Sequence, residues 1–486
     1  MSVLALDLGT TSWKAGIYGE DGCELAVRRI VMPARQDSEG NAFYAPDDLT
    51  SSLRSLILAL PVEYRERIRY IALAGMAEAG VITDRETGEA LSPILPWYDK
   101  RGLPIFEKLQ KEPLLQDRYE KTGLPNSYKY SVYKLLALAK QTSRHSETLS
   151  WLGIVEYAAF ILSGKTAAEP TLAARTYAFD IVKGAWDKEF LNALGFDETV
   201  FPPVVPSGSP MGIVKKEWAK DLHLPPDAKV CICGHDHICA AFGAHALESG
   251  RLFCSMGTAQ VLLAMKNTSS ISERDTMTGL SFGPAPLGGL TVLGSIQSAG
   301  GSITLMNRLL YGGSGFDSLM KEAETIQDGP GSILYFPYLN GSGAPHVSGS
   351  IRGGFLGLGT DTTRAGLLKA VYEGIAFESR LILESFGLSG IHGITACGGL
   401  NGHRKLMQIM ADVLCLPVCV LEAEECTLYG AAGLACLNDG ITLPKPAKKE
   451  VFAPRPKIAA AYESAYRNSY LPLSNFLFQH YDKEQS

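Results

Sequence analysis

The sequence contains no run of apolar residues long enough to cross a bilayer. Met1 and Ser2 lead directly into an apolar segment, without the basic and apolar stretches of an export signal. Basic residues are not in excess, because 45 Lys and Arg stand against 51 Asp and Glu, which gives a formal charge of −6 and argues against nucleic-acid binding through bulk charge. The ten cysteines lie mostly in apolar stretches such as 414–420, which is typical of reduced core thiols. We therefore expect a cytoplasmic protein with no membrane and no nucleic-acid partner.

The chain is long enough for at least two hydrophobic cores. It has 486 residues, and its apolar and charged fractions, 46% and 20%, are normal for a globular enzyme. Short apolar segments mixed with longer amphipathic ones predict an α/β or α+β architecture. We expect strands at 3–8, 69–74, 80–84 and 230–232, and helices at 47–60, 131–142, 148–163, 238–247 and 361–385. The helical spacing of Tyr462, Tyr466 and Tyr470 predicts a docked helix face rather than a binding site.

The opening segment contains a strand, an acidic residue, a turn and a second strand. Asp7 precedes the turn formed by Gly9, Thr10, Thr11 and Ser12. Such a turn directs backbone N–H groups and hydroxyls toward one small volume, which suits phosphate oxygens. Asp7 could hold a hydrated Mg²⁺, since this ion prefers carboxylate and water ligands. The alternative is a hairpin whose glycine and threonines only turn the chain.

A second segment, 251–263, repeats the pattern of the first about half a chain length later. Gly257 and Thr258 occupy its turn. Two similar units suggest a duplicated fold, so we place a domain boundary near residue 245, between domains 1–245 and 246–486.

Asp236 lies in the densest polar cluster, residues 231–237, which contains two cysteines and two histidines. A zinc site in this cluster is rejected because no second Cys/His pair stands at finger-like spacing, and Cys231 and Cys233 fit the alternation of a buried strand. Asp236 then follows the strand and a glycine and precedes a helix, where it can act as a general base toward a hydroxyl. The alternative is that Asp236 only caps the helix.

Two glycine pairs lie where a strand or loop meets a helix. Gly398 and Gly399 follow the strand predicted at 394–397 and precede a helix that begins near Arg404, an arrangement that lets a nucleotide approach the backbone. Gly300 and Gly301 form a similar case, and an ordinary turn is the alternative for both pairs. Neither the 164–166 segment nor the 354–359 segment completes a phosphate-binding or dinucleotide-binding motif.

Taken in order, these segments resemble the FGGY family of carbohydrate kinases, which has the ribonuclease-H-like fold of the actin-like ATPases. The resemblance extends over nearly the whole chain. It rests on the motifs at 7–12, 96–101, 162–180, 234–237, 255–258, 352–377, 398–399 and 425–432. It implies an α/β protein of two ribonuclease-H-like domains with a cleft between them. Two departures are the missing tryptophan after Lys134 and the Leu400-Asn401-Gly402 segment, where small residues are usual.

The resemblance also implies the reaction and its residues. The γ-phosphoryl group of ATP would pass to a hydroxyl of a sugar or polyol, with Asp236 accepting the proton and Asp7 holding Mg²⁺. The nucleotide would be bound by Thr10, Thr11, Ser12, Lys14, Gly257, Thr258, Gly300, Gly301, Gly398, Gly399 and His403. The acceptor would be bound by Met76, Ala77, Glu78, Trp97, Asp99 and Asp236. Domain closure would assemble the phosphate site and exclude water. Related kinases are often dimers, so a homodimer is possible.

The loop Gly75–Ala79 bears on the acceptor. Xylulose kinases usually carry a histidine where this chain has Glu78, whose carboxylate can accept hydrogen bonds from two hydroxyls and would repel an anionic aldonate. We expect a neutral ketose or polyol, with xylulose the nearest named guess and glycerol or gluconate as alternatives. Glu78 could instead point to solvent or pair with Arg101. A non-catalytic actin-like ATPase and a degenerate sugar-binding paralogue are the competing classes.

Overall fold

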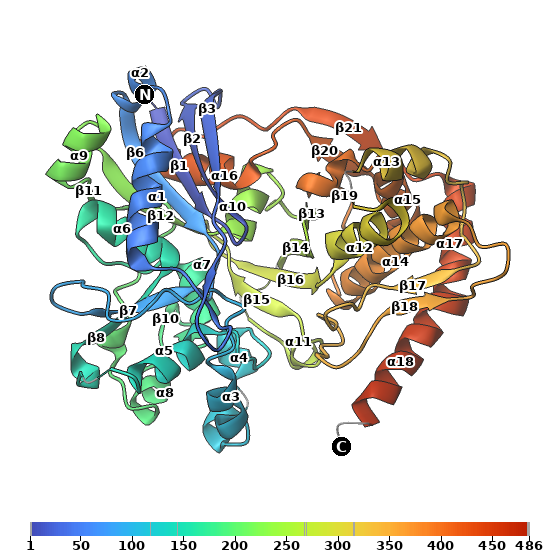
Figure 1. Ribbon diagram of the computed structural model, residues 1–486, viewed down its shortest axis with the longest axis horizontal. Coiled ribbons are helices and arrows are strands. Elements are labelled where there is room, and N and C mark those ends of the chain that lie inside the picture. Colours follow the sequence, from blue (N-terminus) through green and yellow to red (C-terminus); the bar gives the residue numbers. More distant parts are fainter. Residues whose placement is uncertain are drawn as a thin grey trace.

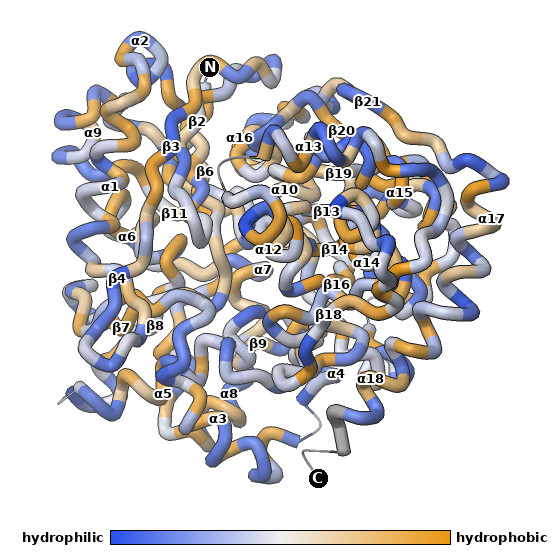
Figure 2. Tube along the Cα trace, turned by 45° about the vertical axis from the view of Figure 1, so that its right-hand side comes forward, coloured by the Kyte–Doolittle hydropathy of each residue, from blue (hydrophilic) through white to orange (hydrophobic). Residues whose placement is uncertain are grey.

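The computed structural model describes residues 2–483 except 117, 143, 267, 269, 314 and 315, with side chains described up to residue 480. Two sheets, one from each half of the chain, are flanked by helices (Figure 1). Apolar and polar residues alternate along many of the helices (Figure 2), as expected where one helix face packs on a sheet.

The first sheet places three strand ends at one edge. Its order is β11 (Pro210–Ile213), β12 (Lys229–His235), β6 (Ile68–Gly75), β1 (Ser2–Leu8), β2 (Ser12–Gly19) and β3 (Glu24–Val31). β1 and β12 both run parallel to β6, whereas β1, β2 and β3 are antiparallel. Because parallel strands end at the same edge, the turn after β1, the loop after β6 and the segment after β12 converge there.

The second sheet repeats this plan. Its order is β15 (Ser281–Pro284), β16 (Leu290–Ile296), β14 (Gln260–Lys266), β13 (Arg251–Met256), β19 (Gly393–Cys397), β20 (Val418–Leu421) and β21 (Lys448–Phe452). β13 forms a hairpin with β14 and is parallel to β19, as β1 forms a hairpin with β2 and is parallel to β6. The repeat of the turn that the sequence suggests is therefore part of a repeated strand arrangement.

Helices cover both faces of the first sheet. On one face lie α1 (Pro46–Leu58), α6 (Ile154–Ser163) and α9 (Lys216–Leu222), and on the other lie α10 (Asp236–Gly243) and α16 (Cys426–Cys436). α16 comes from the second half of the chain but packs on β1 and β6 of the first sheet. It also packs closely on α10, since a Cβ added at Gly430 would lie 1.8 Å from the Cys239 carbonyl oxygen.

The second sheet is packed against a longer set of helices. These are α12 (Ala299–Tyr311), α13 (Asp317–Glu324), α14 (Arg364–Ser385), α15 (Arg404–Leu414), α17 (Pro456–Ala465), the π-helical turn η7 (Tyr466–Tyr470) and α18 (Leu471–Lys483). α14 begins where the Thr363 hydroxyl accepts a hydrogen bond from the Gly366 N–H. The three tyrosines at helical spacing are all buried, and Tyr466 and Tyr470 stack beside Phe377, which confirms the docked face.

The remaining elements are short. The strands are β4 (Arg35–Gln36), β5 (Ala42–Phe43), β7 (Gly80–Asp84), β8 (Leu149–Gly153), β9 (Phe179–Asp180), β10 (Ala185–Trp186), β17 (Leu334–Phe336) and β18 (Gly354–Leu356). The helices are α2 (Val62–Arg65), α3 (Leu103–Leu109), α4 (Tyr119–Thr122), α5 (Ser131–Ala139), α7 (Pro170–Ala173), α8 (Lys188–Ala193) and α11 (Glu273–Thr276).

Two predicted helices have other bounds in the structure. Residues 149–153 form β8, which pairs with β7, and the helix begins only at Ile154. The Glu156 carboxylate accepts a hydrogen bond from the Gly153 N–H and so fixes this start. The helix predicted at 238–247 is also displaced, since α10 begins at Asp236 and ends at Gly243.

In the part of the chain that the structure describes, no helix has the length and apolar character needed to cross a membrane.

Candidate active site

The turn after β1 lies beside a buried carboxylate with a free oxygen. Among the described residues, Asp7 Oδ1 is buried and has no hydrogen-bond partner, while Lys14 Nζ lies 3.7 Å from Oδ2. Burial is the largest influence on this group and raises the pKa of Asp7 to about 7, with Lys14 acting in the opposite direction. A bound cation would satisfy the orphaned oxygen, so Asp7 fits the predicted role of a Mg²⁺ ligand.

Thr10 connects the phosphate turn to the acceptor side. Its hydroxyl accepts a hydrogen bond from Trp97 Nε1 at 3.0 Å, and its carbonyl oxygen accepts one from the Tyr44 hydroxyl at 3.3 Å. Thr11 is exposed and Ser12 is half-buried at the start of β2. The predicted nucleotide residues and the predicted acceptor residue Trp97 therefore meet at this turn.

Lys14 points toward two carboxylates. Its ammonium donates to Glu425 at 2.6 Å in addition to facing Asp7, and Arg29 donates to the other Glu425 oxygen at 2.6 Å. Glu425 directly precedes α16, so this ion pair joins the two halves of the chain. The predicted contact of Lys14 with phosphate stays a prediction.

The second turn, between β13 and β14, is tied to the start of α12. The Gly300 N–H donates to the Gly257 carbonyl oxygen at 3.2 Å, and the Gly301 N–H donates to the Thr258 carbonyl oxygen at 3.1 Å. The structure thus brings together four residues that the sequence predicts to bind nucleotide.

A cavity of about 430 Å³ opens beside this turn. Its lining combines backbone at Gly257, Gly300 and Gly399 with the apolar side chains of Ile303, Phe316, Leu400 and Met320. His403 also lines it, and the His403 Nδ1 lies 2.7 Å from the Tyr372 hydroxyl, which holds the ring in place. A Cβ at Gly399 would meet no atom within 4 Å, so the backbone there is open to a ligand, and the cavity suits an aromatic base with phosphates.

Gly398 is placed differently from its neighbour. It has a φ of 104°, and a Cβ would lie 2.6 Å from the Met256 carbonyl oxygen. It does not belong to the lining of the cavity. The turn behind the cavity therefore requires glycine at position 398. Direct contact of Gly398 with the nucleotide stays a prediction.

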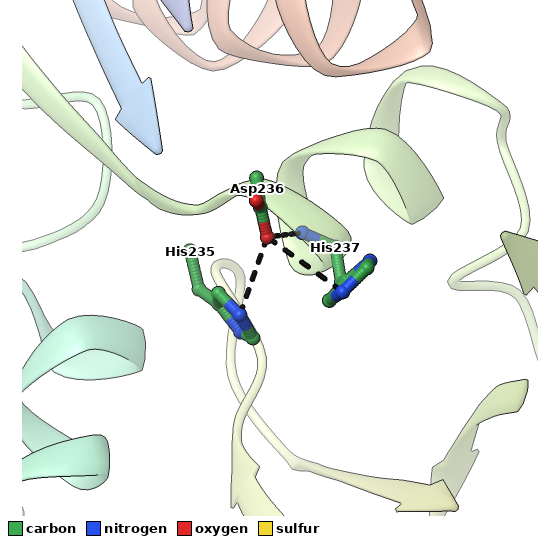
Figure 3. A group of neighbouring side chains, drawn as sticks. All are labelled: His235, Asp236 and His237. Carbon is green, nitrogen blue, oxygen red and sulfur yellow. Dashed lines mark hydrogen bonds and ion pairs between the residues drawn. The ribbon is translucent and has the colours of Figure 1, made fainter. Parts of the chain in front are cut away.

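Asp236 is the first residue of α10, directly after β12. His235 occupies the position before the helix, so the alternative that Asp236 is its cap residue is wrong. Asp236 Oδ1 accepts a hydrogen bond from the His237 N–H at 2.7 Å and lies 3.2 Å from His235 Nε2 (Figure 3). Burial raises the pKa of Asp236 and lowers the pKa of His235 well below its ordinary value. The charges of Glu78 and Lys14 also act on the Asp236 pKa, which places all three groups in one electrostatic environment.

Glu78 lies on the acceptor side and is paired with Arg175. Arg175 Nε and Nη2 both lie close to Glu78 Oε1, at 2.7 and 2.5 Å. The two alternatives for Glu78 are therefore wrong, because its side chain is only 10% exposed and Arg101 is paired with Asp99 instead. Glu78 has a φ of 59°, a left-handed conformation that is unusual for glutamate and aims its side chain inward.

Asp99 and its neighbours differ in their access to the predicted acceptor site. The Asp99 side chain is fully buried, and its carboxylate accepts hydrogen bonds from the Arg101 side chain and backbone N–H. Asp99 therefore positions the segment through Arg101, while Trp97 is half-buried. Met76 and Ala77 are each 3% exposed and pack in the core behind Glu78.

Lys129 is a further cation on the acceptor side, beside Trp97. No sequence motif indicates it. Its ammonium lies 5.8 Å from the centre of the Trp97 ring. Burial lowers the pKa of Lys129, while Glu78 raises it and Arg175 lowers it. No carboxylate lies within ion-pair distance of Lys129 among residues 2–480 that the structure describes.

The sequence motifs assign no role to Arg175, Lys129 or Glu425. The 162–180 motif contains Arg175, but only the folded chain shows that it faces Glu78. Glu425 lies in the 425–432 motif, and its ion pair with Lys14 is likewise visible only in the folded chain. For Arg175, a lone charge in the largely apolar segment 172–179 is the signal that could have drawn attention to it.

Comparison with known proteins identifies the family. The model of the N-terminal domain of the FGGY family of carbohydrate kinases matches residues 2–243, and the model of its C-terminal domain matches residues 252–438. The chain belongs to the FGGY family of carbohydrate kinases. As a member of this family it is a phosphotransferase with an alcohol group as acceptor, in a family that depends on ATP, and it has the two-domain fold of the actin-like ATPases.

Individual FGGY relatives have different named activities. The chain is 27% identical to xylulose kinase of Bacillus subtilis over 448 residues, covering 90% of this chain and 88% of that protein. It is 25% identical to glycerol kinase of Limosilactobacillus reuteri over 452 residues, covering 90% and 89%. The crystal structure of gluconate kinase from Lactobacillus acidophilus shares the fold with a TM-score of 0.88, 23% identity and 99% coverage of both chains.

Proposed function

We propose that this FGGY kinase transfers the γ-phosphoryl group of ATP to a hydroxyl of a neutral ketose or polyol, with xylulose as the nearest named guess. The observation that carries the proposal is the position of Asp236. It follows β12, which pairs with β6 as β1 does on the other side, so Asp236 lies at the sheet edge where the phosphate turn after β1 and the Glu78 loop after β6 also end, and it shares the electrostatic environment of Asp7 and Glu78. Cleft closure would bring the nucleotide cavity toward this edge.

In the proposed reaction Asp236 accepts the proton of the attacking hydroxyl. The Asp236 carboxylate has no Lys or Arg within ion-pair distance among the described residues, and burial raises its pKa, which makes it a stronger base than an exposed aspartate. Asp7 would hold Mg²⁺, which when bound supplies charge neutralisation at the phosphate oxygens. The two turns would bind phosphates, and His403 with the apolar lining of the cavity would hold the base of the nucleotide.

The acceptor side favours a neutral molecule. The charges of Glu78 and Arg175 compensate each other, and those of Asp236 and Lys129 are of opposite sign, so these four groups carry no net positive charge that would select an anionic acceptor. Glu78 Oε1 receives both bonds from Arg175, which leaves Oε2 to accept from a hydroxyl of the acceptor. The xylulose and glycerol kinase relatives support this class, and glycerol and gluconate are the alternative acceptors. The homodimer and the cytoplasmic location stay predictions.

The test is acceptor-dependent ADP release with a panel of neutral ketoses, polyols and aldonates. Asp236→Asn keeps the shape of the side chain but removes the base, and loss of a general base typically lowers kcat by about 10²- to 10⁴-fold. We expect this loss with ATP binding retained, and no loss in the matched control Asp227→Asn, which changes an exposed aspartate. If wild type releases no ADP with any acceptor, a non-catalytic ATPase or a sugar-binding paralogue is favoured instead.

A further inference from the structure

Three consecutive side chains at the start of α10 gather around one small volume. His235, Asp236 and His237 each offer one ligand atom, and these atoms all lie within 4.8 Å of one another. The Asp236 Oδ1 lies 3.2 Å from His235 Nε2 and 4.0 Å from His237 Nε2. Figure 3 shows both imidazole rings on the same side of the carboxylate. Two imidazoles and a carboxylate are the donor types that Zn²⁺ accepts in catalytic sites with three protein ligands.

We propose that His235, Asp236 and His237 bind one divalent transition-metal ion of the zinc type, on the carboxylate oxygen that faces both histidines. This site differs from the predicted Mg²⁺ site at Asp7, since Mg²⁺ prefers oxygen ligands and imidazole favours Zn²⁺, Co²⁺ and Ni²⁺. It departs from the expectation that this cluster holds no zinc, and Cys231 and Cys233 supply no ligand because they are buried in β12.

At least one of the three side chains must move for tetrahedral coordination, because the three ligand atoms are separated by up to 4.8 Å. Ligand atoms about 2.0 to 2.2 Å from a tetrahedral metal lie about 3.4 Å from one another. The Asp236–His235 separation of 3.2 Å already matches this value, whereas the Asp236–His237 separation of 4.0 Å exceeds it. The His237 side chain is 33% exposed and can turn inward, while the His235 side chain is held by burial. An open fourth position would remain for water or a ligand oxygen.

Both imidazoles are available as ligands. Across the residues that the structure describes, the only polar group near either ring nitrogen, apart from the other imidazole, is Asp236 Oδ1, at 3.2 Å from His235 Nε2 and 4.0 Å from His237 Nε2, and the rings meet edge to face with centroids 5.2 Å apart. The neighbouring pair of Glu78 and Arg175 has compensating charges, so it adds no net positive charge against a cation.

The catalytic consequence rests on the proposed function. An ion on Asp236 would compete with the acceptor proton for the carboxylate and would therefore block proton transfer. We expect Zn²⁺ to inhibit the kinase even in excess Mg²⁺, and a chelator to restore its rate.

Metal binding is measured on the full chain after chelator treatment and dialysis, with neither ATP nor acceptor present. ZnCl₂ is titrated by calorimetry, and CoCl₂ by the visible absorption of the bound ion. We expect one equivalent to bind, and millimolar MgCl₂ not to displace it. Even supporting partners of a metal ligand contribute about 10- to 100-fold to affinity, so His237→Gln is expected to weaken binding at least about tenfold. The matched control His145→Gln changes an exposed histidine and is expected to bind as wild type does.

Equal Zn²⁺ affinity in wild type and His237→Gln would overturn the proposal, as would the absence of a Co²⁺ absorption band in wild type. Asp236→Asn gives a second measurement if a histidine variant fails to fold, since loss of the carboxylate is also expected to weaken binding. The proposed kinase function has a separate outcome, because it fails if the Mg²⁺-supplied, zinc-free protein releases no ADP with any acceptor. That failure leaves the binding titration unchanged, so the two proposals are distinguishable.

Discussion

Replacement of Arg175 by methionine tests the acceptor side most directly. Arg175 directs two N–H groups at Glu78 Oε1, and the two side chains are 19% and 10% exposed. The guanidinium carbon also lies 5.5 Å from the centre of the Tyr130 ring. Arg175→Met keeps much of the apolar volume but leaves the Glu78 carboxylate buried without its partner.

The expected loss in the free energy of unfolding of Arg175→Met follows from the burial of this ion pair. Breaking a buried ion pair by removing one partner costs about 3 to 5 kcal/mol, and the partial exposure here favours the lower end, about 3 kcal/mol. The double variant Glu78→Gln/Arg175→Met removes both charges and should regain most of that loss. Function should not return with stability, because a hydrogen bond to a charged group contributes about 1.5 to 3 kcal/mol, which corresponds to about 10- to 100-fold in acceptor KM.

Urea unfolding and ADP release are measured on the two single variants and the double variant. We expect the acceptor KM to rise in all three, with the KM for ATP unchanged. Arg144→Met provides a matched control, since Arg144 is 51% exposed and its surface pair with Asp84 should contribute less than about 1 kcal/mol. An unchanged acceptor KM in Arg175→Met, with stability lowered, would show that the pair only supports the fold and would refute its role in acceptor binding.

Three further predictions concern other groups. Burial raises the pKa of Glu378 from 4.5 to about 7, so its contribution to stability is present below pH 4.5 and is lost as the pH rises through 7. In urea unfolding, Glu378→Gln should match wild type at pH 4 and exceed it by up to about 3 kcal/mol at pH 8; parallel pH profiles would contradict this. Lys129→Met should raise the acceptor KM but not the ATP KM, with partial rescue by Lys129→Arg, whereas a fall in kcat alone would exclude a binding role. Asp7→Asn should raise the Mg²⁺ concentration for half-maximal ADP release by about tenfold or more, and an unchanged Mg²⁺ requirement would contradict the assignment.

The sequence predicts those parts of the site that depend on local chain geometry. The two strand–turn–strand segments and Asp236 after β12 are formed by residues adjacent in sequence, so their residue types indicate their positions. Arg175 lies 97 positions from Glu78, and its role depends on contacts that no local pattern contains. The same reason explains β8, because residues 149–153 become a strand only through pairing with the distant β7.

The placement of α16 has a consequence for how the chain folds during synthesis. Leu428, Ala431 and Ala432 of α16 cover Tyr70 and Ala72 of the first sheet. Until residue 436 has left the ribosome, α10 lies on that face but the apolar part under α16 stays uncovered. A fragment ending near residue 245 would expose the same face, so the N-terminal half alone is expected to aggregate. Its solubility should return when a segment containing residues 426–436 is supplied, which makes the first sheet dependent on the last quarter of the chain.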